Sequence, residues 1–431
     1  MEERSRHVAY RFRAYPTLAQ LAVLEKWQHA QRALWNSANA QRLERLSRPG
    51  YDMLRPKRYL SAFDQHVELT ECRRALDWLR EVPQMLQQDL LTQLDRAWKR
   101  FFAREGGRPR FKRKLRGDWA PLGIAARECK RISRKRVRIP KLGEVRVCGH
   151  RRIVGQPVRV SLTREVDQWF MSITCELTEA KPEAPSGNAI GLDLGIANVL
   201  ADSDGALVNN PRHLATAGKR LARAQRTAAR RKPKRGQAAS NNYRKATRKV
   251  ALLHRKVRRQ RADMLHVLSH HYANNHSTVV IEDLRVRNMS SSARGTKEEP
   301  GARVRQKAGL NRAILDVGWH ELRRQLAYKC ERSGAKLLVV DPRYSSQQCR
   351  SCGVVDAISR RSQADFVCVA CGHVAHADVN AAQNILARGL GYAGATPVSV
   401  CGGLAVGQPS MQKEVRVSDL RTSPVLQGGV G

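Results

Sequence analysis

The sequence predicts a multidomain protein in which a mixed α/β layer is joined to a small antiparallel β-sheet or barrel and a helical region. After residue 188, three short apolar strands alternate with helices, which is typical of an α/β layer. Before residue 180, apolar residues recur every three to four positions in some stretches and every second position in others. A Pro- and Ser-containing segment at 181–188 is the predicted linker between the two parts.

The first part begins and ends with strand-like segments that enclose helices. Residues 1–15 alternate basic and apolar side chains, and period-two alternation returns over 136–178. Between them, apolar residues at helical spacing predict helices from Thr17 onward and over about 83–104. A basic segment interrupted by Gly and Pro follows at 104–116.

The second part is expected to contain buried strands at Ala189–Leu192, Thr278–Ile281 and Ala335–Val340. Leu310–Cys330 and Asp378–Leu390 are predicted helices. Beyond residue 391 the chain is rich in Gly, Pro, Ser and Val without periodicity, so residues 391–431 are expected to form a poorly ordered tail.

The composition indicates a protein that works with a polyanion. The length of 431 residues suggests roughly three domains at about 150 residues each. Lys and Arg number 79 against 38 Asp and Glu, so the formal net charge is +41 at pH 7. Because such a surface repels itself unless a polyanion covers it, nucleic acid is the expected partner. This balance excludes an ordinary enzyme that acts on small neutral metabolites.

The positive charge is concentrated in one stretch. No acidic residue occurs between Asp204 and Asp263, while 19 Lys and Arg lie within 211–261. Such a run is often only a solvated helix face or a disordered tail. Inside a globular region, however, a run of one sign is costly without a counter-charge, which favours a pair of helices that contacts phosphates.

The sequence also indicates where in the cell the protein is located. No apolar run approaches the roughly 20 residues of a membrane-spanning helix, so a membrane protein is excluded. The first residues show no apolar core of a secretory signal. Ten cysteines are too few for a disulfide scaffold of this length, so a reducing, cytoplasmic location is expected.

A zinc site is predicted from two CxxC motifs separated by fifteen residues. The four cysteines are Cys349, Cys352, Cys368 and Cys371. Two tight turns that each present two thiolates complete a tetrahedron around one Zn²⁺, and this spacing is typical of a zinc ribbon. Gly353 and Gly372 follow the second cysteine of each motif, where the turn favours positive φ. A redox pair or four unrelated buried thiols are the alternatives. A site with four cysteines leaves no open coordination position, so the metal is expected to be structural.

Three carboxylates at the ends of predicted elements are the candidate catalytic residues. Asp193 ends the first strand, Glu282 ends the second, and Asp378 opens the last helix. Singly, each has a structural explanation as a turn residue, an exposed strand end or a helix cap. Together, in so basic a chain, they suit Mg²⁺, which binds carboxylate and phosphate oxygens at once. Two such ions about 4 Å apart would support phosphodiester hydrolysis. Asp341 is a rival ligand, whereas strand alternation points Asp283 away from Glu282.

These residues lie in segments that resemble one family. The segments are GLDLGIANVLADSDG (191–205), VVIEDLRVRNM (279–289), DVGWHELRRQLAYKCERSGAKLLVVDPRYSSQQCRSCG (316–353) and FVCVACGHVAHADVNAAQNILARG (366–389). They resemble TnpB, the RNA-guided endonuclease of small bacterial transposons, which is related to compact type V CRISPR effectors. Two departures are Ala377, where the family often has Arg, and Asp341, where an uncharged residue is more usual.

The resemblance implies an RNase H-like (RuvC) nuclease core over 189–345 and 374–390, with a zinc ribbon inserted at 346–373. It also implies a wedge-type β-barrel over 1–15 and 117–180, with a helical recognition domain at 16–116. The family's three acidic positions fall on Asp193, Glu282 and Asp378, which would hold two Mg²⁺ ions.

The implied activity is cleavage of double-stranded DNA at one RuvC site. A guide RNA derived from the transposon end selects the target together with a short flanking DNA motif. The basic stretches 104–116 and 211–261 are the candidates for contact with the RNA and the heteroduplex. A monomer with bound RNA near the nucleoid of a prokaryotic cell is expected, although the sequence leaves the oligomeric state open.

Three alternatives remain open from the sequence. The chain resembles compact CRISPR effectors, although its tail is more typical of a transposon protein. A non-cleaving RNA-guided repressor would usually have lost an acidic residue, and this chain keeps all three. A DDE-type transposase would also need three carboxylates, but the zinc ribbon between the last two argues against it.

Overall fold

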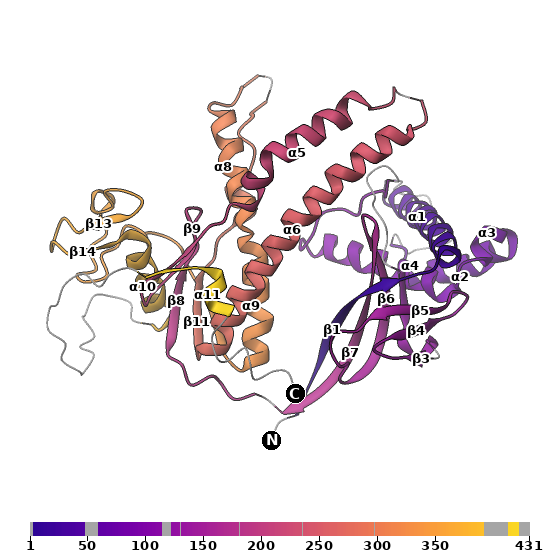
Figure 1. Cartoon of the computed structure of the whole chain (residues 1–431), viewed down its shortest axis with the longest axis horizontal. Coiled ribbons are helices and arrows are strands. Elements are labelled where there is room, and N and C mark those ends of the chain that lie inside the picture. Colours follow the sequence, from indigo (N-terminus) through magenta and orange to yellow (C-terminus); the bar gives the residue numbers. More distant parts are fainter. Residues whose placement is uncertain are drawn as a thin grey trace. The chain divides into compact units, whose positions relative to one another are not determined.

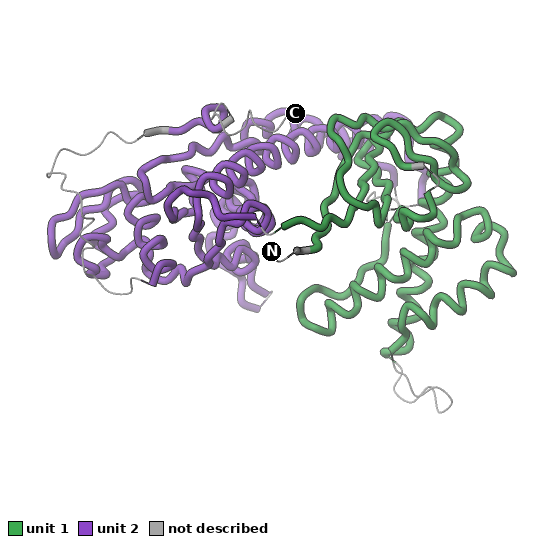
Figure 2. Tube along the Cα trace, turned by 90° about the horizontal axis from the view of Figure 1, so that it is seen from below, with its two compact units in different colours: residues 1–180 green, residues 181–431 purple. Residues whose placement is uncertain are grey.

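The computed structural model describes residues 3–47, 59–113, 122–129, 131–180, 182–234, 236–296, 298–391 and 413–421. The chain divides into two compact units, residues 1–180 and 181–431 (Figure 2). This division falls at the start of the predicted linker 181–188. Within the described ranges, no helix is both long enough and apolar enough to cross a membrane.

The N-terminal unit contains an antiparallel sheet with the strand order β2-β6-β7-β1-β5-β4-β3 (Figure 1). Its strands are β1 (Glu3–Tyr15), β2 (Leu122–Ala125), β3 (Arg131–Ile132), β4 (Arg136–Ile139), β5 (Gly143–Cys148), β6 (Gln156–Glu165) and β7 (Gln168–Ala180). Strand β1 lies at the centre, paired with β5 on one side and β7 on the other. The first strand of the chain therefore pairs with strands more than 120 residues away, as the alternation at both ends of this unit requires.

The alternation read from the sequence decides which face of this sheet is buried. Tyr10, Phe12 and Ala14 are buried, whereas Arg11 and Arg13 are exposed. The buried face packs on Leu24 and Trp27 of helix α1 (Leu18–Ser47). Hydrophobic burial on one side and charge on the other hold the strand in a single register.

Helices fill the interval between β1 and β2. They are α1 (Leu18–Ser47), α2 (Ala62–Ala75), α3 (Asp77–Arg80) and α4 (Gln84–Phe102), and the 3₁₀ turn η2 (Ala126–Glu128) follows β2. Trp98, Leu90 and Leu94 of α4 form a second core with Trp35 of α1. Buried Arg42 joins these helices through Asp95, which accepts a hydrogen bond at 3.1 Å.

The C-terminal unit is built on a mixed sheet with the order β12-β11-β8-β9-β10-β15. Its strands are β8 (Ala189–Asp193), β9 (Asn198–Asp202), β10 (Ala206–Asn209), β11 (Thr278–Glu282), β12 (Lys336–Val340) and β15 (Lys413–Val415). Strands β8, β11 and β12 are parallel, and β8, β9 and β10 run antiparallel to one another. A separate hairpin consists of β13 (Asp365–Val367) and β14 (Val374–His376).

Helices cover both faces of this sheet. The helices of the unit are α5 (His213–Arg230), α6 (Asn241–Asn275), α7 (Val286–Met289), α8 (Val304–Val317), α9 (Trp319–Ser333), α10 (Ala377–Gly389) and α11 (Val417–Arg421), with the 3₁₀ turn η3 (Ala357–Ser359). Ile190 and Leu192 of β8 pack with Leu265 of α6 and Leu326 of α9 in the main core. The opposite face of β8 lies against α10. The long α5–α6 pair forms a helical hairpin (Figure 1).

The single helix predicted at Leu310–Cys330 is wrong, because the structure has two. Helix α8 ends at Val317 and α9 begins at Trp319, with Gly318 between them in the left-handed conformation at φ 83°. Apolar periodicity continues across the break, so only the glycine marks it.

The poorly ordered tail predicted from residue 391 is wrong for residues 413–421. Strand β15 pairs with the edge strand β10 in parallel, and Leu420 of α11 is buried in the main core. The unpaired backbone N–H and C=O groups at the edge of β10 explain this pairing. A strand of three residues is too short to show a periodic pattern in the sequence. The rest of the predicted tail after residue 391 lies outside the described residues.

Candidate active site and metal centre

Strands β8 and β11 bring Asp193 and Glu282 to the same edge and the same face of the sheet. The strands are parallel neighbours, with Ile281 opposite Leu192 one residue before each carboxylate. Side chains alternate, so Gly191 and Asp193 lie on the face opposite the core residues Ile190 and Leu192. The same argument places Glu282 on that face. Two acidic residues 89 positions apart in the chain are thereby made neighbours.

Helix α10 brings the third carboxylate to this face. A Cβ on Gly191 would lie 2.2 Å from the backbone oxygen of Ala382, and a Cβ on Gly389 would lie 2.5 Å from Val280. The helix backbone therefore lies directly on β8 and β11, and only glycine permits this approach. Asp378 is in its first turn. The cap is His376, whose ring accepts a hydrogen bond from the Asp378 backbone N–H, so the capping explanation for the Asp378 side chain is wrong.

Two of the carboxylates act electrostatically on the third, Asp193. Burial, followed by the negative charges of Glu282 and Asp378, raises the pKa of Asp193 to about 8. Burial also raises the pKa of Glu282, although the Ser345 hydroxyl and the positive charge of Arg388 oppose this. Buried like charges at one sheet edge are costly, so this cluster is suited to a bound cation.

A positive side chain from the zinc region reaches the cluster. Arg360, directly after η3, donates a hydrogen bond to Asp378 Oδ1 at 2.9 Å. Its charge also lowers the pKa of Asp193 and so partly offsets the carboxylate repulsion. Nothing in the sequence signals this residue, because it lies in an irregular segment 18 positions before Asp378.

The rival carboxylates lie elsewhere. Asp283 forms an ion pair at 2.5 Å with Arg323 of α9, on the face opposite Glu282 as strand alternation predicts. Asp341 is exposed, and its carboxylate accepts a hydrogen bond from the Arg343 backbone at 3.0 Å. The charges that act most strongly on Asp193 are those of Glu282, Asp378 and Arg360 instead.

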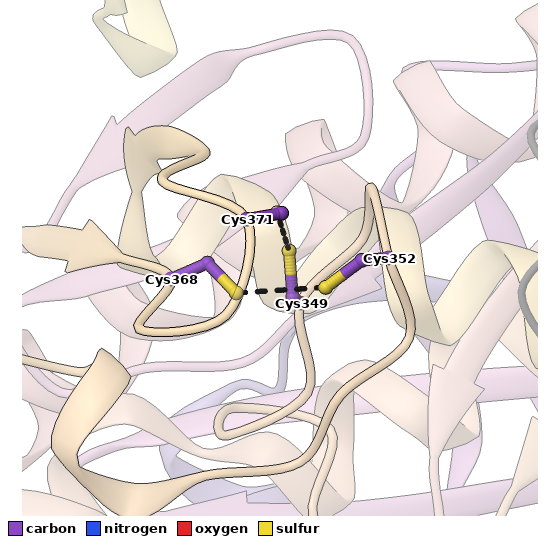
Figure 3. Close-up of side chains that lie close together, drawn as sticks. All are labelled: Cys349, Cys352, Cys368 and Cys371. Atoms are coloured by element: carbon purple, nitrogen blue, oxygen red, sulfur yellow. Dashed lines mark hydrogen bonds between the residues drawn. The ribbon is translucent and has the colours of Figure 1, made fainter.

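The four predicted cysteines converge on one point (Figure 3). Their sulfur atoms all lie within 4.8 Å of one another. Cys349 and Cys371 Sγ are 3.8 Å apart, and Cys352 and Cys368 Sγ are 3.5 Å apart. A tetrahedral zinc site with Zn–S bonds of about 2.3 Å requires sulfur separations of about 3.8 Å. The cluster therefore has the donor set and the dimensions to hold a structural zinc ion.

The two knuckles have the predicted turn geometry. Gly353 and Gly372 have φ of 77° and 71°, and their N–H groups donate to the carbonyls of Cys349 and Cys368. Backbone N–H groups, that of Cys371 first, lower the pKa of Cys368 to about 6, whereas burial raises the pKa of Cys349 to about 12. Without a metal, Cys368 is therefore the thiol that ionises more readily of the two. The second knuckle connects β13 and β14, and β14 leads directly into α10.

The predicted basic pair of helices is present as the α5–α6 hairpin. A groove of about 870 Å³ lies between the two helices. The lining residues are mostly basic: Lys219, Arg220, Arg223, Ala224, Thr227, Arg231, Lys245, Ala246, Lys249 and Leu253. Ala224 and Ala246 are buried and small, so the helices approach closely while their long cationic side chains line the groove.

The described part of the other basic stretch, residues 104–113, is fixed against α1. Trp35 Nε1 donates to the carbonyl of Arg110 at 3.0 Å, and Asn36 exchanges two hydrogen bonds with the Lys112 backbone. The side chains of Arg108 and Arg110 remain exposed. Residues 114–116 of this stretch lie outside the described residues.

Comparisons with known proteins agree with these features. The family described as "Probable transposase" matches residues 172–293, and "Cas12f1-like, TNB domain" matches residues 319–385, which contain the four cysteines. A family described as "Helix-turn-helix domain" matches residues 1–50, where the structure has β1 and α1.

Full-length relatives extend the agreement. "Putative RNA-guided DNA endonuclease InsQ" of Escherichia coli is 36% identical over 88% of this chain and 92% of its own length. "Putative RNA-guided DNA endonuclease" of Streptomyces pristinaespiralis is 33% identical over 89% of each chain. The solved Cas12f1–sgRNA–target DNA complex shares the fold, with a TM-score of 0.52 at 13% identity over 89% of this chain and 98% of that one. Identity at this level over nearly the whole of both chains shows that this chain belongs to the TnpB family.

Proposed function

We propose that this protein is an RNA-guided DNA endonuclease in which Asp193, Glu282 and Asp378 hold two Mg²⁺ ions at the scissile phosphodiester. The observation that supports this most strongly is their convergence: two parallel strands and one helix bring three carboxylates to one sheet edge, where Glu282 and Asp378 repel the charge of Asp193. A structural role would not require three like charges at one place, two of them on the buried side chains of Glu282 and Asp378.

The topology supports an RNase H-like (RuvC) core at residues 189–345 and 374–390. Its strands run in the order β12-β11-β8-β9-β10, with an antiparallel β8-β9-β10 meander followed by parallel β11 and β12. We assign 346–373 to the zinc ribbon insertion and 181–188 to the linker. The sheet strands in 1–15 and 117–180 would form the wedge-type barrel, and the helices in 16–116 the recognition domain.

The oxygen atoms of the three carboxylates are spread more widely than the sulfur atoms of the four cysteines. Among the described residues, only the four cysteines form a set of three or more metal-binding side chains whose ligand atoms all lie within 4.8 Å. In a site with two ions about 4 Å apart, some ligands lie between the ions and others on their outer sides. The ligand atoms of such a site are therefore spread over more than 4.8 Å.

The chain's own groups have defined tasks in this proposal. Bound Mg²⁺ would supply an activated water and stabilise the departing oxygen. Asp193 must lose its proton to become a ligand. Arg360 donates to Asp378 and limits the repulsion within the cluster. Zinc on the four cysteines would hold the knuckles, and through β14 the start of α10 that carries Asp378.

The nucleic-acid surfaces follow from the charge. We assign the α5–α6 groove and the basic stretch at 104–116 to contact with the backbone of guide RNA and heteroduplex. Arg suits this task because its guanidinium donates two hydrogen bonds to one phosphate. Sequence selection would then be left to base pairing, which is consistent with a groove lined by charge rather than by base-reading side chains.

The test begins with the RNA that co-purifies with the protein, whose sequencing identifies the guide segment. With DNA matched to that guide and Mg²⁺ present, we expect cleavage of both strands. Asp193→Ala should abolish cleavage and retain RNA and target binding, whereas Asp283→Asn, next to Glu282 but on the other face, should cleave as the parent does. Cleavage by Asp193→Ala at the parent's rate, or binding by the parent without any cleavage, would refute the proposal.

A further inference from the structure

One buried side chain holds Glu282. Ser345, four residues before the first zinc cysteine, donates its hydroxyl to Glu282 Oε1 at 2.5 Å. Both are almost fully enclosed, with exposures of 4% for Ser345 and 7% for Glu282. The Ser345 oxygen also lies 3.1 Å from the Pro342 carbonyl, but a hydroxyl has a single hydrogen. The shorter bond to the carboxylate takes it, because hydrogen bonds to charged acceptors are the stronger ones.

Ser345 is itself held by α10. Asn384 donates to the Ser345 carbonyl at 3.0 Å and to the Gln348 carbonyl at 2.7 Å. One turn earlier, Asn380 donates to the same Gln348 carbonyl at 2.8 Å and accepts from the Arg350 backbone at 2.9 Å. Because residues four apart share one helix face, the side-chain amides of Asn380 and Asn384 both bind the 345–350 segment through hydrogen bonds.

This segment connects three parts of the candidate site. Its hydrogen-bonded residues, Gln348 and Arg350, flank the zinc cysteine Cys349. The helix that grips it carries Asp378 in its first turn. Its far end carries the hydroxyl that binds Glu282. The positions of two carboxylates are therefore fixed by the same set of contacts.

We infer that Ser345 is a positioning residue, which orients Glu282 toward the bound cations and is held in place by Asn384. This inference rests on the proposed function. Glu282 has three rotatable side-chain bonds, and repulsion from Asp193 favours rotamers that turn it away. The Ser345 bond occupies one carboxylate oxygen and leaves the other for a cation. Hydrogen-bonded partners of this kind tune metal affinity about ten- to a hundredfold.

The experiment measures metal binding separately from activity. Mn²⁺ is titrated into the protein–RNA complex and followed by electron paramagnetic resonance. The titration of the Asp193→Ala complex gives the background from RNA, and the difference reports the carboxylate sites. We expect Ser345→Ala to raise the Kd of these sites by about tenfold or more. It should raise the Mg²⁺ concentration for half-maximal cleavage by a similar factor, with zinc content and target binding unchanged.

Ser269→Ala is the matched control. Ser269 of α6 is equally buried and donates to the Leu265 carbonyl at 2.6 Å, but it lies in the main core rather than beside a carboxylate. This variant should keep the parent's Mn²⁺ affinity. Ser345→Thr, which retains the hydroxyl, should recover part of the affinity that Ser345→Ala loses.

Each outcome decides the matter. Parental Mn²⁺ affinity in Ser345→Ala, or an equal loss in Ser269→Ala, overturns the inference. If Ser345→Ala fails to bind RNA or zinc, Asn384→Ala is the deciding variant, because Asn380 still holds Gln348. Its Mn²⁺ affinity must then be weakened for the inference to stand. If the parent shows no sites that Asp193→Ala removes, the proposed function itself fails.

Discussion

Binding of Mg²⁺ at the three carboxylates should release a proton from Asp193. Burial and the charges of Glu282 and Asp378 raise its pKa to about 8, so the neutral form is favoured at pH 7. A group with this pKa is roughly nine-tenths protonated at pH 7 and one-tenth protonated at pH 9. A cation needs the ionised form. Binding should therefore release about 0.9 proton at pH 7 and about 0.1 at pH 9.

The same shift determines how Mg²⁺ affinity and stability depend on pH. Below pH 8 the proton competes with the cation, so affinity should fall by about tenfold for each pH unit. A carboxyl whose pKa is higher in the folded protein contributes stability below its unfolded value of 3.8, and this is lost as pH rises toward 8. Without Mg²⁺, Asp193→Asn should therefore become more stable relative to the parent across this range, by at most about 4 kcal/mol at pH 7.

Calorimetric titration of the protein–RNA complex with Mg²⁺ measures the released protons. Runs in two buffers of different ionisation enthalpy, such as HEPES and Tris, give the number of protons per binding event. Asp193→Asn provides the background from RNA and the other groups. Equal proton release by parent and variant at pH 7, or a release that does not decline by pH 9, would show that Asp193 is not the group that gives up the proton.

Three further predictions test the architecture around the site. Gly191→Ala would place a Cβ 2.2 Å from the Ala382 oxygen, so α10 must move by about 1 Å, and we expect a roughly hundredfold slower cleavage with RNA binding intact. Gly309→Ala in α8, where nothing lies within 4 Å, should leave the rate unchanged. Cys349→Ser should lower the zinc content, loosen the segment that α10 grips and abolish cleavage, and full cleavage after complete zinc removal would contradict this. Replacing Arg223 and Lys245 of the α5–α6 groove with Gln should weaken RNA binding and lower the slope of log K against log salt by roughly one per residue. An unchanged slope would show that the groove contacts no phosphate.

Much of the candidate site could be predicted from the sequence because its ligands stand at the ends of regular elements. Asp193 and Glu282 close short apolar strands, and parallel strands bring their ends to one edge. The zinc cysteines follow a spacing that tight turns impose. In each case a local sequence pattern is enough to predict which side chains come together in the fold.

The site residues that the sequence did not reveal lie in irregular segments and contact carboxylates of other elements. Arg360 and Ser345 lie in loops, and each acts on a carboxylate from another element. Asn380 and Asn384 did leave a signal, since two asparagines four apart lie on one face of a helix. Their partners, however, are backbone carbonyls of a loop, which no side-chain pattern identifies.

Two elements of the fold were predicted wrongly, one because an apolar pattern continued across a break between helices and one because a strand was too short to show a pattern. Apolar periodicity runs through Gly318, so two helices looked like one. Strand β15 is three residues long and is explained by the open edge of β10 rather than by its own sequence.

Whether the three carboxylates hold two divalent ions is tested most directly by locating Mn²⁺ through its anomalous scattering in crystals of the protein–RNA–DNA complex. We expect two peaks about 4 Å apart, bound by Asp193, Glu282 and Asp378 on the face of the sheet that α10 covers. Well-ordered carboxylates without any Mn²⁺ between them, or peaks held only by other residues, would contradict it.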